Sequence, residues 1–199
     1  MIKLFWCPKT RSSRVLWMLE ELGVEYERVH IDIRDPAAPR DADFGRASPM
    51  GKVPAIVDGD ATVADSAAIA LYLADRYSAG NLAPSIDAAD RGEYLYWMVY
   101  TPGVIEPAMA EKITGMEPNR VSFGWGDFPT MVATLEARLT DREWLLDRFT
   151  AADVMVGSSC AFLKQFNLLP ESPAIESYIE RCLARPAYKR ALEIDEAGA

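Results

Sequence analysis

The chain of 199 residues contains a single histidine, His30, and this scarcity excludes several kinds of active site. A Ser-His-Asp triad and a Cys–His pair both need a histidine base. His30 lies in "YERVHIDI", where apolar Val29, Ile31 and Ile33 alternate with polar residues. The alternation predicts a strand with His30 pointing away from the core. The spacing of metal ligands is absent too, so we expect no metal ion.

Long apolar runs, a cysteine framework and an excess of positive charge are also missing. No run approaches the roughly 18 apolar residues of a membrane-spanning helix, and the residues up to Pro8 contain no apolar h-region, so we expect neither a membrane partner nor a signal peptide. Three cysteines without framework spacing favour a reducing compartment, with the cytoplasm as the default. A net charge of −9 argues against non-specific nucleic-acid binding, which depends on Lys and Arg contacts to phosphates.

Half of the residues are hydrophobic and 26% are charged, which is typical of a globular protein. The first eighty residues alternate between strand and helix patterns. Strands are predicted at "IKLFW", around His30, and at "VPAIVDG" and "ATVA", which are joined by a hairpin turn at Asp58-Gly59-Asp60. Helices are predicted over 11–22 and 66–77, with a short segment near Phe44. The order is therefore β-α-β, an irregular piece, and β-β-α.

The stretch "SAGNLAPSIDAAD" has the composition of a linker, and only helices are predicted beyond it. They cover 88–112, with a kink at Pro102-Gly103, then 128–139, 151–166, 174–184 and a short last helix. Cys160 and Cys182 lie among the packing residues of these helices. We predict an α/β unit over residues 1–79, followed by an all-α helical unit over residues 87–199.

Two stretches resemble the glutathione S-transferase family. "GKVPAIVDGDATVADSAAIALYLADRY" is similar to the glutathione-binding half of that family, which has a thioredoxin-like fold, and "DRFTAADVMVGS" is similar to a helix start in its helical domain. In that helix start, Thr150 and Asp153 fit a capping box, whose role is in folding. The resemblance extends from "LFWCPKTRSSRVLWMLEELGVEYE" to "ARPAYKRA", so it covers nearly the whole chain.

The resemblance implies a thioredoxin-like N-terminal domain, an all-α C-terminal domain that lines the electrophile site, and a homodimer. It also implies glutathione as co-substrate, a small hydrophobic electrophile, a role in detoxification in the cytoplasm, and no metal. The electrophile pocket would be lined from the first long helix by Tyr96, Met98, Tyr100 and Met109, although such residues at helical spacing more often belong to the core.

Five residues are implied by the resemblance to bind glutathione. The Val53-Pro54 bond is cis in the family, which frees the Val53 backbone to pair with the cysteinyl backbone of glutathione. Ser66 and its backbone would hold the γ-glutamyl carboxylate, with Asp65 nearby, and Lys52 would meet the glycyl carboxylate. Each residue also has a structural explanation, because proline often begins a strand, Asp and Ser often cap helices, and an exposed lysine is often a solvated charge.

The stretch "WCPKTRSSRVLWMLEEL" holds the candidates for thiol chemistry. The serine-type subgroups of the family align their activating serine with Thr10, whose hydroxyl would hydrogen-bond the glutathione thiolate. "CPKT" also resembles the "CPxC" of thioredoxin-like reductases, and Cys7 at a helix start would form a mixed disulfide with glutathione. Ser12 is a weaker candidate, since a serine in the first turn of a helix often only caps it. Thr10 and Cys7 stay open alternatives.

These candidates predict three different functions. The first is conjugation of glutathione to a small hydrophobic electrophile, with Thr10 activating the thiol. The second is glutathione-dependent thiol-disulfide reduction through Cys7. The third is a non-catalytic glutathione-transferase-like interaction protein, and the intact "GKVP…DS" stretch argues against it, because a scaffold does not need a peptide carboxylate site.

Overall fold

The computed structural model describes residues 1–35, 38 and 40–198, and the chain divides into two compact units. The first unit contains Met1–Ala79 together with the chain from Arg185 onward. The second unit contains Gly80–Ala184.

A four-stranded mixed sheet forms the centre of the first unit. Its strands are β1 (Ile2–Trp6), β2 (Tyr26–His30), β3 (Ala55–Asp58) and β4 (Ala61–Ala64), in the order β2-β1-β3-β4. β1 and β2 are parallel and are joined through helix α1 (Ser12–Leu22), whereas β3 runs antiparallel to both β1 and β4. This arrangement confirms the predicted thioredoxin-like fold of the N-terminal part.

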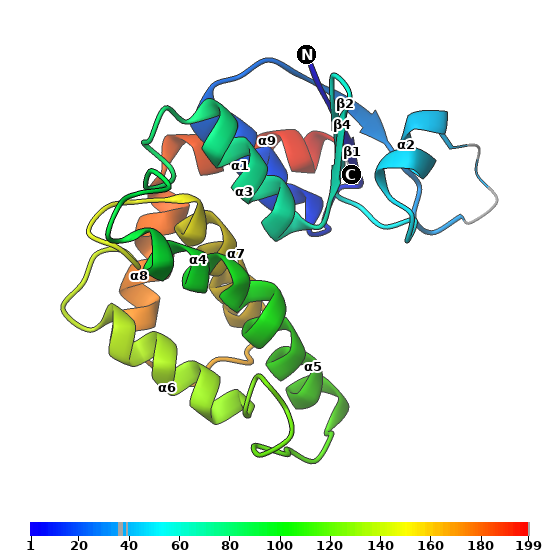
Figure 1. The fold of residues 1–199 in the computed structure, drawn as a ribbon. Helices are drawn as coiled ribbons and strands as arrows, with labels where there is room; N and C mark the ends of the chain where they lie inside the picture. Colours follow the sequence, from blue (N-terminus) through cyan, green and yellow to red (C-terminus); the bar gives the residue numbers. More distant parts are fainter. Residues whose placement is uncertain (36–37, 39, 199) are drawn as a thin grey trace. The chain divides into compact units, whose positions relative to one another are not determined.

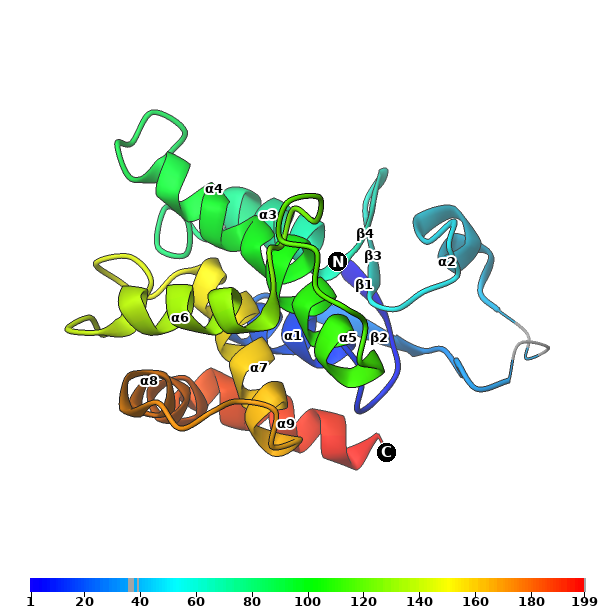
Figure 2. The ribbon, with the colours of Figure 1, turned by 90° about the horizontal axis from the view of Figure 1, so that it is seen from below.

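Helices cover both faces of this sheet. Figures 1 and 2 show α1 and α3 (Ser66–Tyr77) on one side and α2 (Ala42–Ala47) on the other. Phe44 of α2 packs with Phe5 of β1, with ring centroids 5.4 Å apart, in a cluster that includes Ala55. Since neighbouring residues of a strand point to opposite faces, the buried Leu4 lies on the face of α1 and α3.

The predicted strand around His30 is shorter than the alternation suggests. β2 ends at His30, which is exposed as expected, and Ile33 beyond it is also exposed. Ile31 stays buried because its N–H still donates to the Trp6 carbonyl oxygen at 2.8 Å. Part of the loop rich in Pro and Asp that follows lies outside the described residues.

The last helix, α9 (Pro186–Ala197), packs on α1 in the first unit, whereas the sequence placed all residues beyond 87 in the helical unit. Arg185 donates to both carboxylate oxygens of Glu21 at 2.6 and 2.8 Å. Tyr188 meets Trp17 edge-on, with ring centroids 5.1 Å apart. These contacts hold the helix against α1.

The second unit consists of helices, as predicted. They are α4 (Arg91–Tyr100), the π-helical turn η1 (Thr101–Ile105), α5 (Glu106–Thr114), α6 (Phe128–Leu139), α7 (Ala151–Gln165) and α8 (Pro173–Ala184). The predicted helix over 88–112 is thus interrupted at Pro102-Gly103 by the π turn, because proline supplies no N–H to the helix. Within residues 1–35, 38 and 40–198, no helix has the length and apolar character that crossing a membrane requires.

The capping box predicted at the start of α7 is present. The Thr150 N–H donates to Asp153 Oδ2 at 2.8 Å, and Asp153 Oδ1 accepts from the Leu145 N–H at 3.0 Å and the Tyr178 hydroxyl at 3.1 Å. Asp153 is fully buried, so one carboxylate joins α7 to α8 and to the loop before α7. Its role is structural, as the sequence predicts.

Candidate functional site

Four segments with polar side chains meet at one end of the sheet. β1 and β2 are parallel with Trp6 opposite His30, so the chain leaves both strands at the same end. Phe5 lies opposite Ala55 and Ala55 opposite Ala64, so β3 begins and β4 finishes at that end as well. Segments 7–10, 31–34, 53–54 and 65–66 are therefore neighbours, although the sequence separates them widely.

The loop Cys7–Arg11 connects β1 to α1 and contains the three predicted catalytic residues. The Thr10 hydroxyl donates to the Cys7 carbonyl oxygen at 2.6 Å and lies 3.0 Å from Ser12 Oγ. The Ser12 N–H donates to Thr10 Oγ1 at 3.2 Å, and the Cys7 N–H donates to Ser12 Oγ at 3.4 Å. Ser12 is buried and Thr10 is half-buried, so the threonine is the more accessible hydroxyl.

The Cys7 thiol is shielded from solvent. Cys7 has no exposed surface, and Arg34 Nη1 lies 3.9 Å from its Sγ. Arg34 comes from the segment after β2 and is itself exposed. The sequence did not single out Arg34, although the parallel β-α-β pattern places the ends of β1 and β2 together. A buried thiol is poorly placed to attack a disulfide unless its cover moves.

The predicted glutathione-binding residues lie at the start of β3 and at the start of α3. The Val53-Pro54 bond is cis, as the resemblance implies. Asp65 caps α3, since its Oδ1 accepts from the Ala67 N–H at 2.9 Å. Ser66 is buried, and its hydroxyl has no hydrogen-bond partner in the described part of the chain.

Lys52, the fifth predicted binding residue, has a fixed backbone and an exposed side chain. Its N–H donates to Ser48 Oγ at 2.9 Å, and its carbonyl oxygen accepts from the Ser48 hydroxyl at 2.7 Å. Ser48 is buried, so this pair of bonds sets the path of the chain toward Val53. The ammonium group of Lys52 is left on the surface.

One further residue reaches the Cys7–Arg11 loop from the far end of the sequence. The Lys9 N–H donates to Asp195 Oδ2 at 3.0 Å. Asp195 lies on α9 and is only 6% exposed. With 186 residues between the two partners, no local sequence signal indicates this contact.

The residues predicted to line an electrophile pocket do not form one group. Met98 and Tyr100 are buried in the helical unit, where the Tyr100 hydroxyl donates to the Met131 carbonyl oxygen at 3.2 Å and burial raises the Tyr100 pKa to about 12. Tyr96 is 49% exposed. Cys160 is buried, which raises its pKa to about 12, and Cys182 is buried as well, so both are packing residues, as predicted.

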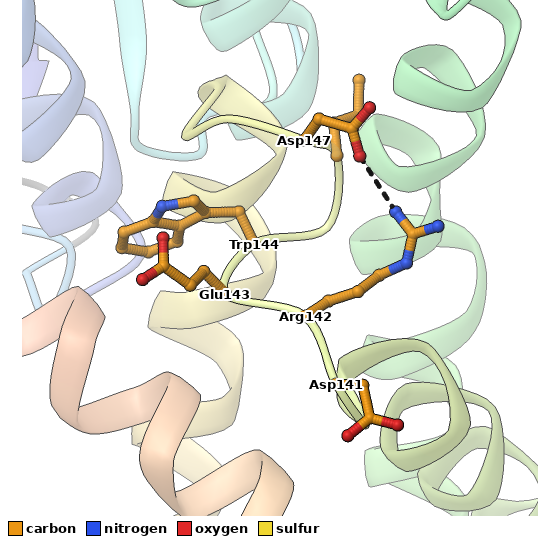
Figure 3. A pocket seen from close by; sticks show the side chains of 6 residues that line it. Asp141, Arg142, Glu143, Trp144 and Asp147 are labelled. Atoms are coloured by element: carbon orange, nitrogen blue, oxygen red, sulfur yellow. Dashed lines mark hydrogen bonds and ion pairs between the residues drawn. The ribbon is translucent and has the colours of Figure 1, made fainter.

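Two hollows on the helical unit contain none of the predicted site residues. One, of about 360 Å³, is lined by Asp141, Arg142, Glu143, Trp144, Leu146 and Asp147, and Figure 3 shows the Arg142–Asp147 ion pair that spans it at 3.3 Å. The other, of about 320 Å³, is lined by Glu111, Lys112, Gly115, Met116, Phe128 and Pro129. In the described residues, no three His, Cys, Asp or Glu side chains gather as metal ligands.

Comparison with known proteins agrees with this geometry. Residues 6–76 match the family described as glutathione S-transferase, N-terminal domain. Over 107 residues the chain is 36% identical to glutathione S-transferase 3 of Schizosaccharomyces pombe, a match that covers 54% of this chain and 43% of that protein. It is 28% identical to glutathione S-transferase F7 of Arabidopsis thaliana, over 96% of this chain and 99% of the relative. It is also 26% identical to the disulfide-bond oxidoreductase YfcG of Escherichia coli, over 96% and 94% of the two chains.

Solved structures match along the whole chain. A glutathione transferase from Methylococcus capsulatus has a TM-score of 0.83 and 26% identity, over 99% of this chain and 100% of that one. A sphingomonad glutathione S-transferase complexed with glutathione has a TM-score of 0.78 and 25% identity, over 98% of each chain. The chain therefore belongs to the glutathione S-transferase family.

Proposed function

We propose that this protein is a glutathione transferase that conjugates reduced glutathione to small hydrophobic electrophiles, with Thr10 activating the thiol. One observation carries the choice of residue: the Thr10 hydroxyl is half-buried at the start of α1, whereas the Cys7 thiol has no exposed surface. Relatives named glutathione S-transferases, and the sphingomonad structure that holds glutathione, support glutathione as the co-substrate.

Glutathione would lie along the end of the sheet where the four segments meet. Its cysteinyl backbone pairs with the backbone of Val53, and its γ-glutamyl carboxylate meets Ser66 at the start of α3. The unpartnered Ser66 hydroxyl supports this position, since the start of a helix favours an anion. The exposed ammonium of Lys52 meets the glycyl carboxylate. Asp65 holds the first turn of α3 in place rather than contacting the peptide strongly.

Thr10 would stabilise the thiolate by redirecting its hydrogen. That hydrogen now points to the Cys7 carbonyl oxygen, and a bound thiolate is a stronger acceptor because it carries a full charge. Ser12 Oγ, 3.0 Å away, can then donate to Thr10 Oγ1. Ser12 is therefore a supporting residue. A free thiol titrates near pH ~8.5, so this bond raises the thiolate fraction at neutral pH.

The chemistry that follows is a substitution. The glutathione proton leaves to solvent, and the sulfur lone pair attacks the electrophilic carbon. A carbon–sulfur bond forms, and with an aryl halide the halide departs with the electron pair of its bond. The residues of this chain hold the peptide and stabilise the anion before the attack.

Disulfide reduction through Cys7 is the second candidate function. The Arg34 guanidinium, 3.9 Å from Sγ, favours it because it supplies a positive charge beside the sulfur, and the Escherichia coli relative is named a disulfide-bond oxidoreductase. This route requires Arg34 or the loop to move, since the thiol is buried. A homodimer in the cytoplasm and a role in detoxification remain predictions from the resemblance.

Substitutions at Thr10 and Cys7 distinguish the two activities. Thr10→Val keeps the shape and removes the hydroxyl, Thr10→Ser keeps the hydroxyl, and Cys7→Ser removes the thiol. Ser13→Ala, which removes a neighbouring half-buried hydroxyl, is the matched control. We measure glutathione binding, conjugation to an aryl halide and reduction of a glutathione mixed disulfide.

We expect Thr10→Val to lower kcat/KM for conjugation by about 100-fold. Thr10→Ser, Cys7→Ser and Ser13→Ala should stay close to the wild type, and all four variants should still bind glutathione. Normal conjugation by Thr10→Val, with disulfide reduction lost only in Cys7→Ser, would support the reductase instead. Tight binding without turnover in any assay would favour the non-catalytic protein.

A further inference from the structure

We infer that Asp195 of α9 is a positioning residue for thiol activation, because it fixes the backbone of the loop that presents Thr10. The inference rests on the proposed function and adds a residue from the end of the chain to the site. Asp195 acts through Lys9, the residue before Thr10, and we assign it no contact with substrate.

Lys9 adopts a backbone conformation that needs support. Its φ is +57°, in the left-handed region, which costs about 1 kcal/mol for a residue other than glycine. Its N–H donates to the buried Asp195 carboxylate at 3.0 Å, and a hydrogen bond to an ionised group is about twice as strong as one between neutral groups. Without this acceptor, Lys9 would relax toward negative φ and turn the Thr10 hydroxyl away from its present direction.

α9 provides a rigid support for the carboxylate. Arg185 binds both oxygens of Glu21, and Arg190 donates to Glu20 at 2.9 Å, so the helix is fixed on α1 independently of Asp195. The end of the helix also presses on the chain before Cys7. A Cβ added at Gly198 would lie 2.4 Å from the Trp6 ring. α9 therefore contacts the chain on both sides of Cys7, at Trp6 and at Lys9.

The carboxylate is not saturated by its one bond. Asp195 Oδ1 is buried and meets no donor among residues 1–35, 38 and 40–198. An unsatisfied buried oxygen costs roughly 1–3 kcal/mol, so the residue is an expensive way to stabilise the helix alone. An amide at this position keeps one oxygen for the Lys9 N–H and removes the unpaired charge. Asp195→Asn is therefore the conservative variant.

The experiment compares Asp195→Ala, Asp195→Asn and Glu196→Ala in the full chain. Glu196 is the exposed carboxylate next to Asp195 on the same helix and is the matched control. We expect Asp195→Ala to lower kcat for conjugation about 10- to 100-fold while KM for glutathione stays within about twofold. Asp195→Asn should restore kcat, and Glu196→Ala should leave it unchanged. A merely structural role would not produce this split or this rescue.

Two results would overturn the inference: wild-type kcat in Asp195→Ala, or an Asp195→Asn enzyme as slow as Asp195→Ala. If Asp195→Ala does not fold, Gly198→Ala displaces the end of α9 from Trp6 without removing the carboxylate. We expect it to lower kcat as well, and a Gly198→Ala protein with wild-type kcat would then refute the inference.

Hydrogen exchange at the Lys9 amide separates failure of this inference from failure of the proposed function. If the wild type conjugates nothing, the proposed function fails, but the Lys9 amide can still be followed by NMR. We expect its exchange to accelerate at least about 10-fold in Asp195→Ala and to stay slow in Asp195→Asn, while the α1 amides keep their protection. Unchanged Lys9 exchange in Asp195→Ala contradicts the inference whatever the activity.

Discussion

Asp65 begins α3 with a φ of +76°, a conformation that is costly for residues other than glycine. The same residue caps the helix, because Oδ1 accepts from the Ala67 and Ala68 N–H groups at 2.9 and 3.4 Å. An alanine would lose the cap, worth about 1 kcal/mol, and would also pay at least about 1 kcal/mol for the positive φ. A glycine would lose the cap but adopt the conformation freely.

We therefore expect the stability of the substituted proteins to fall in the order Asn, Gly, Ala. Asp65→Asn should lie within about 0.5 kcal/mol of the wild type, and Asp65→Ala should lose about 2 kcal/mol. Urea unfolding followed by circular dichroism measures the series. If Asp65→Ala were more stable than Asp65→Gly, the backbone at this position would not be under strain.

Single residues of the site were predictable only where a local pattern announces them. "GKVPAIVDG" and the helix start after Ala64 carry the binding residues in one continuous stretch, so Val53, Pro54 and Ser66 could be proposed from the sequence. Arg34 was missed because a lone arginine in a loop has no local signal. The choice between Thr10 and Cys7 also needed coordinates, because the sequence does not reveal that the thiol is buried.

At the scale of elements, the capping box of α7 carries more than a helix start. Thr150→Ala removes a cap and should cost about 1 kcal/mol. Asp153→Ala leaves the Leu145 and Thr150 N–H groups and the Tyr178 hydroxyl buried without their acceptor. At about 1–3 kcal/mol for each lost acceptor, we expect a loss of at least 3 kcal/mol. Equal losses in the two variants, measured by denaturant unfolding, would mean that the carboxylate only caps the helix.

Asp153 also predicts an unusual pH dependence of stability. Burial raises the pKa of Asp153 from 3.8 to about 6, although hydrogen bonds from Leu145, Thr150 and Tyr178 oppose the shift. Because folding favours the protonated acid, the contribution of this group to stability is complete below pH ~4 and is lost as the pH rises through about 6. Asp153→Asn does not titrate. The stability of the wild type relative to Asp153→Asn should therefore fall by a few kcal/mol between pH ~4 and ~6 and then level off. A difference that increases with pH in this interval would reverse the assigned shift.

Most helices and strands followed from hydrophobic period and caps. β1, β3, β4, α3, α6 and α7 lie within a residue or two of the predicted ranges. The exceptions have physical reasons. β2 stops at His30 because its partner β1 ends at Trp6, opposite His30, and a one-strand pattern cannot reveal the length of its neighbour. The π turn at Pro102-Gly103 was predicted as a kink, since the sequence shows the missing donor but not how the backbone closes around it.

At the scale of the whole molecule, the position of α9 was the feature least accessible from the sequence. Its own pattern predicts a short amphipathic helix, and such a helix can bury its apolar face against any complementary surface. The contacts that choose α1 are pairs separated by more than 160 residues: Arg185 with Glu21 and Arg190 with Glu20. Charge pairs at such a distance leave no periodic signal in a single sequence.

The Arg185–Glu21 pair should contribute most of the electrostatic attachment of α9. Glu21 is 7% exposed and Arg185 29%, and the carboxylate also accepts from Trp17 Nε1 at 2.8 Å. Removing Arg185 leaves a nearly buried charge with one neutral donor, so we expect Arg185→Ala to cost about 3 kcal/mol. The pair Arg190–Glu20 is the matched control, because its arginine is 52% exposed and a solvated ion pair contributes about 1 kcal/mol or less.

Double-mutant cycles on the two pairs test this difference. The cycle of Arg185→Ala with Glu21→Ala should give a coupling energy of about 1–3 kcal/mol, and the cycle of Arg190→Ala with Glu20→Ala a value below about 1 kcal/mol. Because the chain has two units and need not unfold in one step, hydrogen exchange of the α1 amides is the better measurement. If both couplings were below about 0.5 kcal/mol, the apolar contact of Tyr188 with Trp17 would hold α9 instead, and Asp195 would depend on that contact for its position.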